Sequence, residues 1–563
     1  MDFITLIVMA IIAYVVYFVW RLKNGGPIEK DPAYIKARQE TVAAHIAAGG
    51  KPTGEPLGGA SHGASYFLNT QQLIDKKLAE PVGQSPHNDR MWLGGHCTVT
   101  TRGGKETKCQ AADIYAPNEG HILTVAPTRT GKGTCHLIPN LLTYFGSAVV
   151  NDIKGENAAI TANCRENLNN TVFRFAPFGK NSAYWNPLDF ISAGEDAWED
   201  AAVVADMLID SGKEVSEFWS DEGRNFLRGV ILHVVTSRRT EKRNMAEVRD
   251  ILTQSGDEFD LSLDEMTKSD ITLVKRAANT FINADEKVKA GILSTLNSQM
   301  GIWDSPRLTK IMGKSDFKFE DLKTDFITVY FCIPPERLSV YAPLMRLFFG
   351  VALASMTRDK NKPLFPVTFF LDEFPQLGRM KLIEEGIAYL AGYGVRLWLF
   401  AQDLGQIKSA YGDMTQSIIA NCACRIFSAT SDYYTAQLVS NMCGSMTVPV
   451  ASFGKSQSTG LDGGAPSQSE TVAPTGQLLM TPQEVMAMDR EEGQLIFYQG
   501  ENPVEGIKAP YYEDPHHEGI YDIWDESAPE PDAPETEPGT ESPNEPEPEI
   551  PESEKAAPPP SLS

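Results

Sequence analysis

Residues His121 to Asn140 read His-Ile-Leu-Thr-Val-Ala-Pro-Thr-Arg-Thr-Gly-Lys-Gly-Thr-Cys-His-Leu-Ile-Pro-Asn. The β-rich beginning predicts a strand, the glycine-containing middle a tight loop, and the end the start of a helix. This order is typical of a phosphate-binding P-loop, whose strict pattern is G-x-x-x-x-G-K-[ST]. Ala126 replaces the first glycine and Gly133 replaces the hydroxyl residue, so only the central Gly131-Lys132 is kept.

The residues that are kept are the ones that handle phosphates. Gly131 lets the backbone wrap the phosphates, Lys132 places a cation on the β- and γ-phosphates, and the helix start supplies N–H groups. Thr134 is expected to reach Mg²⁺ in place of Gly133. An ordinary glycine-containing turn is the alternative for this loop taken alone. We therefore expect ATP and Mg²⁺ as cofactors, with the nucleotide bound by Thr128, Arg129, Thr130, Gly131, Lys132, Gly133 and Thr134.

A second motif lies about 240 residues downstream, where the apolar run from Phe365 to Leu371 ends in Asp372 and Glu373. In P-loop ATPases the acid at such a strand end orients Mg²⁺, and a neighbouring Glu polarises the attacking water. We assign Asp372 to the metal and Glu373 to catalysis; a solvated turn is the alternative. A third strand, Val395 to Phe400, leads to Gln402, which we assign as a catalytic γ-phosphate sensor rather than a solvated loop residue.

The fold class that these runs predict is α/β, with a parallel sheet covered by helices. The region from Asn186 to Phe319 has apolar residues at helical spacing and predicts an all-helical insert. The Gly/Ser/Pro-rich stretch from Ser452 to Gly476 predicts a surface loop, so Gly454-Lys455-Ser456 is not taken as a second P-loop. The predicted strands are Ile122–Val125, Ser147–Val150, Val172–Phe175, Phe326–Ile333, Val367–Leu371, Val395–Phe400 and Leu495–Tyr498.

The amino-terminal end predicts a membrane anchor. Phe3 to Trp20 is uncharged, and as a helix it would span ~27 Å against a hydrocarbon core of roughly 30 Å. Arg21, Lys23 and further basic residues follow it, so the positive-inside tendency puts the body in the cytoplasm. A cleaved signal peptide is the alternative, but the stretch has no basic region before the apolar run.

The carboxyl-terminal end is acidic and rich in proline. Residues 525–563 hold twelve Asp/Glu, one Lys and eleven Pro, and they predict a disordered tail that solubilises the protein or binds a basic adaptor. The whole chain has a formal net charge of −24, which argues against binding nucleic acid by bulk charge and leaves a local basic groove open. The eight scattered cysteines fit a reduced compartment.

The motifs together resemble the coupling proteins of type IV secretion and conjugation systems. The resemblance runs from about residue 90 to 510 through Pro127–Gly133, Ile138–Leu142, Asn151–Glu156, Phe370–Phe374 and Ala401–Leu404. It implies a RecA-like P-loop ATPase of the bacterial inner membrane, commonly a homo-hexamer, that contacts inner-membrane secretion components. Such proteins generally have two membrane helices, whereas here one is readable, which predicts a single-pass protein.

The resemblance also implies a function: recruitment of a relaxase–DNA complex, protein effectors or both to a type IV channel, driven by ATP. Arg238, Arg239, Lys242 and Arg243 form a basic cluster that could touch such a substrate, or merely complement a helix end. A docking platform without hydrolysis and a chromosome-pumping translocase are the alternative functions. The expected parts are an anchor (1–23), a juxtamembrane linker region (24–90), a nucleotide-binding domain (91–180 and 323–511), the helical insert (181–322) and the tail (512–563).

Overall fold

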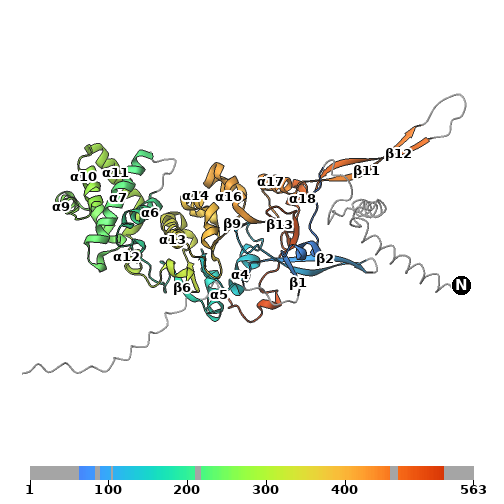
Figure 1. Cartoon of the computed structure of the whole chain (residues 1–563), viewed down its shortest axis with the longest axis horizontal. Coiled ribbons are helices and arrows are strands. Elements are labelled where there is room, and N and C mark those ends of the chain that lie inside the picture. The colour runs from blue at the N-terminus through green and yellow to red at the C-terminus, as the bar shows by residue number, and fades with distance from the viewer. Residues whose placement is uncertain (1–62, 83–88, 103–104, 210–216, 457–466, 525–563) are drawn as a thin grey trace, which may run out of the picture.

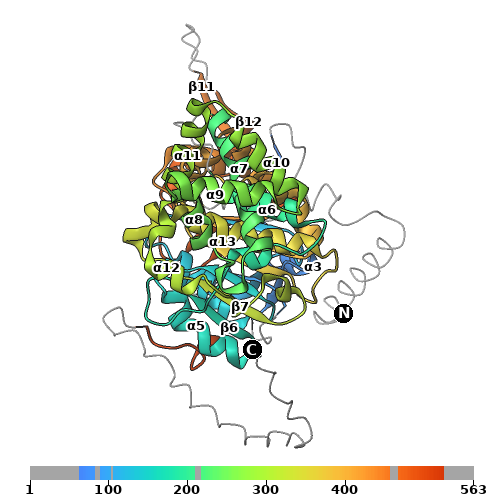
Figure 2. The same cartoon turned by 90° about the vertical axis from the view of Figure 1, so that its left-hand side faces the viewer.

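The computed structural model describes residues 63–82, 89–102, 105–209, 217–456 and 467–524. The predicted anchor at Phe3–Trp20 and residues 525–563 of the predicted tail lie outside the described residues. The helical insert lies at one end of the long axis, a large sheet occupies the middle, and a long hairpin lies at the other end (Figure 1). In the view turned by 90° the helices of the insert lie in front, with β6 and β7 visible below them (Figure 2).

The centre of the main sheet is parallel, as predicted. Its strands are apolar and mostly buried on both faces, which is the pattern that a sheet covered by helices requires. All seven strand runs predicted from the sequence are present, six of them in this part. In spatial order the parallel strands are β10 (Cys422–Ser428), β4 (His121–Val125), β9 (Val395–Ala401), β8 (Val367–Leu371), β5 (Ala148–Asn151), β7 (Ile327–Phe331) and β6 (Thr171–Phe175).

The sheet continues beyond β10 as an antiparallel extension, so the predicted parallel sheet is the centre of a larger mixed sheet. The predicted run at Leu495–Tyr498 is part of β13, which pairs antiparallel with β10. A short connection joins β13 to the next strand, β14, and the two strands pair antiparallel. A parallel pair of neighbouring strands would need a long crossover connection. The extension consists of β13 (Gly493–Tyr498), β14 (Val504–Ile507), β2 (Trp92–Arg102), β3 (Lys105–Tyr115) and β1 (Ala79–Pro81).

Part of the predicted juxtamembrane region belongs to this extension. Residues 63–82 form helix α3 (Thr70–Asp75) and strand β1, which pairs with β3. Asn69 caps α3, and Leu73 is fully buried beneath it. Helix propensity alone does not reveal such a short helix; its capping box and buried leucine hold it in place.

Helices cover both faces of the parallel strands. One face packs against α4 (Ile138–Thr143) and α5 (Glu156–Asn167), and the other against α13 (Leu338–Arg358) and α14 (Lys381–Leu390). In the part of the chain that the structure describes, one helix, Pro335–Arg358, is apolar and long enough to cross a membrane, and its most apolar window is 61% buried inside the protein. The remaining helices near the sheet are α15 (Leu404–Tyr411), α16 (Thr415–Asn421), α17 (Tyr433–Cys443) and α18 (Pro482–Met486).

Residues 181–209 and 217–322 contain helices and no strand, which agrees with the helical region expected there. Its core is continuous with that of the sheet. At the junction of α6 and α13, a Cβ on Gly350 would lie 2.4 Å from Met207 Sδ, so the glycine lets the two helices approach. The main helices are α6 (Ala197–Leu208), α7 (Glu217–Ser237), α8 (Met245–Thr253), α9 (Gly256–Thr267), α10 (Thr272–Ile282), α11 (Glu286–Gln299) and α12 (Pro306–Ile311).

The prediction of a surface loop at Ser452–Gly476 is wrong for the described part of that stretch, residues 452–456 and 467–476, while residues 457–466 lie outside the described residues. The described part belongs to a hairpin of β11 (Ser445–Ser456) and β12 (Ser467–Leu478), paired antiparallel from Ser445↔Leu478 to Ser456↔Ser467. The ladder joins backbone groups, so a Gly/Ser/Pro-rich composition does not prevent it. Buried Met446 and Val448 anchor its base. Gly454-Lys455-Ser456 lies in β11 and does not form a P-loop.

The predicted tail boundary at 512 is also wrong, because residues 508–524, here called the C-terminal strap, pack on the body. Tyr511, Tyr521 and Trp524 are partly buried against Ile138 and Ile160 of α4 and α5. The Asp522 N–H donates to the Ile160 carbonyl at 3.0 Å. These aromatic residues supply the apolar area that the rest of the tail lacks.

Candidate nucleotide-binding site

A pocket of about 1300 Å³ lies at the carboxyl ends of four neighbouring parallel strands, β4, β9, β8 and β5. This edge is where open α/β sheets commonly bind ligands. All ten residues that sequence reasoning assigned to the site line this pocket. They are Thr128, Arg129, Thr130, Gly131, Lys132, Gly133, Thr134, Asp372, Glu373 and Gln402.

The loop after β4 has a tight conformation that its residues explain. Arg129 and Gly131 have φ of 62° and 87°, in the left-handed region. A Cβ on Gly131 would lie 2.7 Å from Cys135 Sγ, so a glycine is needed there. The Thr130 hydroxyl donates to the Pro127 carbonyl at 2.6 Å and closes the turn.

A helical segment begins directly after this loop. Residues Lys132–Leu137 form a π-helical turn that runs into α4. The N–H groups of a first helical turn have no partner within the helix and attract anions. The loop and the helix start therefore form a phosphate cradle, although the first glycine of the strict pattern is absent.

Three predicted functional side chains from three strand ends meet at Glu373. Lys132 Nζ donates to Glu373 Oε1 at 3.3 Å. Gln402 Nε2 lies 3.2 Å from both Glu373 Oε1 and Oε2. Glu373 itself has φ 51°, an uncommon conformation for a residue with a side chain, directly after β8. A cation, a carboxylate and an amide thus form one group beside the phosphate cradle.

Asp372 is the second carboxylate at the end of β8. Burial, and then the neighbouring Glu373 carboxylate, raise the pKa of Asp372 to about 7. Its backbone carbonyl accepts from Asn151 Nδ2 at 2.5 Å, which ties β8 to β5.

The described residues contain no group of three or more His, Cys, Asp or Glu side chains that could hold a metal by themselves. Mg²⁺ in nucleotide sites is bound by one or two protein oxygens together with phosphates and water, so the single carboxylate of Asp372 fits it. Thr134 lines the same pocket, and its hydroxyl lies 3.7 Å from Cys135 Sγ. Its assignment as a metal ligand stays a prediction.

The Asn151–Glu156 motif has a structural explanation. Asp152 is buried, and its carboxylate accepts from the backbone N–H groups of Asn157 and Ala158 at the start of α5, at 3.3 and 2.8 Å. Burial raises the pKa of Asp152 to about 6, while these hydrogen bonds lower it. Gly155 turns the chain with φ 73°. Through these contacts and the hydrogen bond of Asn151 to Asp372, the motif holds β5 and α5 beside β8.

Sequence reasoning missed one wall of the pocket. This wall consists of residues 490–492 and the beginning of the C-terminal strap, from Lys508 to Glu513. Lys508 is buried, and its Nζ donates to the Thr130 carbonyl in the P-loop at 2.7 Å. No sequence motif marks these residues, because they reach the pocket from the antiparallel extension rather than from a βα unit.

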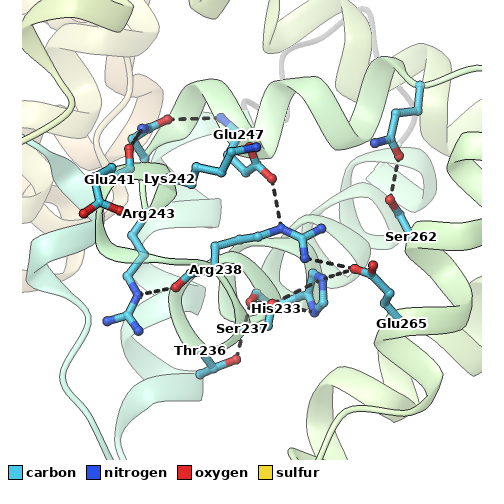
Figure 3. A network of polar contacts seen from close by, with 12 residues as sticks. His233, Thr236, Ser237, Arg238, Glu241, Lys242, Arg243, Glu247, Ser262 and Glu265 are labelled. Carbon is cyan, nitrogen blue, oxygen red and sulfur yellow. Dashed lines mark hydrogen bonds and ion pairs between the residues drawn. The ribbon is translucent and has the colours of Figure 1, made fainter. Parts of the chain in front are cut away.

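Two of the four residues of the basic cluster in the insert, Arg238 and Lys242, are paired with acidic side chains. Arg238 lies between two carboxylates (Figure 3). Its Nε donates to Glu247 Oε1 at 2.9 Å, and its Nη1 donates to Glu265 Oε2 at 2.9 Å. Lys242 Nζ donates to Glu247 Oε2 at 3.3 Å. Arg243 Nε donates to the Arg238 carbonyl at 2.9 Å. These contacts fit the interpretation in which the cluster completes the end of α7.

Comparison with known proteins agrees with these features. The protein VirD4 of Rhizobium radiobacter is 28% identical over 420 residues, which cover 73% of this chain and 60% of that relative. The conjugal transfer protein TraG of Escherichia coli is 29% identical over 496 residues, covering 80% of this chain and 77% of that relative. The chain thus spans about 60% of the length of the VirD4 protein.

Solved structures show the same fold. The plasmid coupling protein TrwB in complex with ADP and Mg²⁺ superposes with a TM-score of 0.55 at 14% identity, over 77% of this chain and 97% of that one. An unbound form of the conjugative coupling protein TrwB superposes with a TM-score of 0.54 at 15% identity, over 69% and 84% of the two chains.

Residues 65–539 match the family described as Type IV secretory system Conjugative DNA transfer. This match covers most of the sequence and includes the phosphate cradle, Asp372, Glu373 and Gln402. The resemblance noted from the motifs is therefore confirmed, and the chain belongs to the family of type IV secretion coupling proteins.

Proposed function

We propose that this chain is an ATP-hydrolysing coupling protein that recruits substrate to a type IV channel and energises its transfer. One observation carries the proposal: Lys132, Glu373 and Gln402 come from three strand ends and meet beside a loop shaped for phosphates. A site that only held nucleotide for stability would need the cradle but not a carboxylate aimed into it.

Each side chain has a role that follows from its position. The P-loop backbone and Lys132 bind the β- and γ-phosphates. Glu373 accepts a proton from the attacking water, and its carboxylate is oriented by Gln402, whose Nε2 lies 3.2 Å from either oxygen. Gln402 is also placed to sense the γ-phosphate, because it follows β9, next to β4 in the sheet.

Asp372 is the residue that would hold the metal. Mg²⁺ bound with the nucleotide would supply positive charge at the β- and γ-phosphates. The raised pKa of Asp372 belongs to the protein without that charge, and a cation beside the carboxylate favours its ionised form. Thr134, from the helical turn that begins at Lys132, is the proposed second ligand.

The proposed setting is the bacterial inner membrane. A single helix at Phe3–Trp20 would anchor the body on the cytoplasmic side, and six subunits would form a ring against the inner-membrane secretion components. The names of the relatives, such as conjugal transfer protein TraG, support a relaxase–DNA complex as substrate, with protein effectors as the other class. The acidic residues 525–563 are the proposed binding segment for a basic adaptor.

The test is ATP turnover and substrate transfer by the full-length protein. Lys132→Ala removes the cation of the phosphate site, and Lys287→Ala, on the exposed surface of α11, is its matched control. We expect turnover to fall at least about a hundredfold in the first variant only, as for loss of a residue that stabilises transition-state charge. Donor cells carrying Lys132→Ala should also lose transfer.

The two alternatives give different results. Transfer that persists in Lys132→Ala cells would indicate a docking platform that does not need hydrolysis. Turnover that depends on long duplex DNA and no secretion component would favour a chromosome-pumping translocase. Crosslinking from the helical insert in cells would then show whether DNA or protein lies against it.

A further inference from the structure

The nucleotide pocket has two chemically different ends. The end near Glu373 holds Lys132 and the P-loop, which suit phosphates. A wall formed by residues 490–492 and 508–513 contributes the carboxylates of Glu491, Glu492 and Glu513 together with the cations of Arg490 and Lys508. The carboxylates of this wall accept hydrogen bonds from neutral hydroxyl and amino groups. The wall therefore offers acceptors to the part of an elongated ligand that carries no phosphate.

The strap is bound to the P-loop on both sides of Lys132. Lys508 Nζ donates to the Thr130 carbonyl at 2.7 Å and to the Arg490 carbonyl at 2.8 Å, and Lys508 is 4% exposed. Two residues beyond Lys132, the Thr134 carbonyl accepts from the Tyr511 N–H at 2.9 Å. These bonds fix the distance between the phosphate cradle and the wall, so the wall is a rigid part of the pocket.

One aromatic side chain, Tyr512, lies among the residues that line the described pocket. Tyr512 is 55% exposed, and its ring makes an edge contact with the ring of the partly buried Tyr511 at a centroid distance of 5.2 Å. An exposed aromatic face at the wall of a pocket offers a surface on which a flat heterocycle can stack. The neighbouring carboxylates would then face the sugar between the stacked base and the phosphates.

We propose that the C-terminal strap forms the nucleoside end of this site, with the base stacked on Tyr512 and the ribose hydroxyls facing the carboxylates of Glu491, Glu492 and Glu513. This inference rests on the proposed function, since it assumes that the P-loop binds a nucleoside triphosphate. It assigns the pocket a ligand with an aromatic base, and it makes the strap part of the site rather than part of the tail.

The test compares two ligands that share the phosphate end. ATP carries a base and inorganic tripolyphosphate does not, so only ATP can use Tyr512. We expect Tyr512→Ala in the full-length protein with Mg²⁺ to weaken ATP binding by roughly five- to a hundredfold and to leave tripolyphosphate binding unchanged. Tyr512→Phe keeps the ring and should bind ATP as the unmodified protein does.

Tyr433→Ala is the matched control, because Tyr433 is 59% exposed and lies on α17, outside the lining of the pocket. Equal effects of Tyr512→Ala on both ligands, or no effect on either, would overturn the inference. Failure of the proposed function gives a different result, in which Lys132→Ala changes the binding of neither ATP nor tripolyphosphate. Loss of both ligands in Lys132→Ala with full binding in Tyr512→Ala would reject the nucleoside wall alone.

Discussion

Lys132 Nζ lies 3.3 Å from Glu373 Oε1, so the cation of the phosphate cradle and the proposed catalytic base form an ion pair across 241 residues of sequence. Both side chains are largely buried, with 10% and 18% exposure. A triphosphate that binds Lys132 would break this pair and leave the Glu373 carboxylate hydrogen-bonded to Gln402. Binding of a triphosphate to Lys132 would therefore also free the Glu373 carboxylate from this ion pair.

Glu373→Gln should separate nucleotide binding from hydrolysis. The variant keeps the shape of the side chain and loses the carboxylate that accepts a proton from water, so turnover should fall by roughly 10²–10⁴-fold. ATP should still bind, which a binding isotherm measures beside the steady-state rate. Glu385→Gln, at an exposed position on α14, is the control. A normal rate in Glu373→Gln would show that another group, Gln402 first, positions the water.

The raised pKa of Asp372 predicts a pH-dependent stability in the absence of nucleotide. Its pKa is about 7 in the folded protein against an ordinary 3.8, so the folded state binds the proton more tightly. The stability from this group is present below about pH 4 and is lost as the pH rises to about 7. Asp372→Asn is neutral throughout and lacks this loss.

Thermal unfolding at several pH values checks this prediction. The Tm of Asp372→Asn minus that of the unmodified protein should increase between about pH 4 and 7 and stay constant above pH 8. With Mg²⁺ and nucleotide present, the unmodified protein should instead have the higher Tm, because only its Asp372 carboxylate binds the metal. A Tm difference that does not change with pH would contradict the assigned environment of Asp372.

Two truncations should distinguish the strap from the tail. Removing residues 525–563 should leave Tm and ATP hydrolysis unchanged, because an acidic Pro-rich segment has little apolar surface to bury. Removing residues 510–563 takes away Tyr511, Tyr521 and Trp524 and exposes Ile138 and Ile160, so Tm should fall by several degrees. Equal Tm values for the two truncations would contradict the packing of the strap.

Substrate delivery provides a second measurement on the shorter truncation. If residues 525–563 recruit a basic adaptor, their removal should abolish transfer of a subset of substrates, and the binding they support should weaken steeply with salt. Unchanged transfer of all substrates would leave the tail with a solubilising role.

Deleting residues 1–23 tests the proposed anchor. The truncated protein should appear in the soluble fraction after sedimentation and keep its ATP site, while ring formation should weaken because the membrane no longer concentrates and aligns the subunits. Continued sedimentation with membranes would point to another membrane-binding segment in the chain.

The parallel half of the protein could be predicted because its signals are local. Each of β4, β8 and β9 is an apolar run followed within a few residues by a loop glycine, a carboxylate or an amide, and parallel strands bring these ends to one edge. The helical insert could be predicted from its periodicity, with buried positions such as Phe226, Leu227, Val230 and Ile231 on one face of α7.

The rest depends on contacts between distant segments. Lys508 and Tyr512 reach the pocket only because β13 and β14 extend the sheet next to β10, and their immediate sequence gives no motif. The hairpin of β11 and β12 is held by its backbone ladder, which a composition of Gly, Ser and Pro does not reveal. The pair between Lys132 and Glu373 likewise exists only once β4 and β8 lie on either side of β9.

The position of Trp524 has a mechanical consequence. It packs against the apolar cluster formed by α4 and α5, and the acidic segment is joined to the body directly after it. A load applied to that segment would pull first on Trp524 and Tyr521. The helix beneath them is the one that begins at Lys132. Traction on the tail would therefore act directly on the nucleotide pocket of the same subunit.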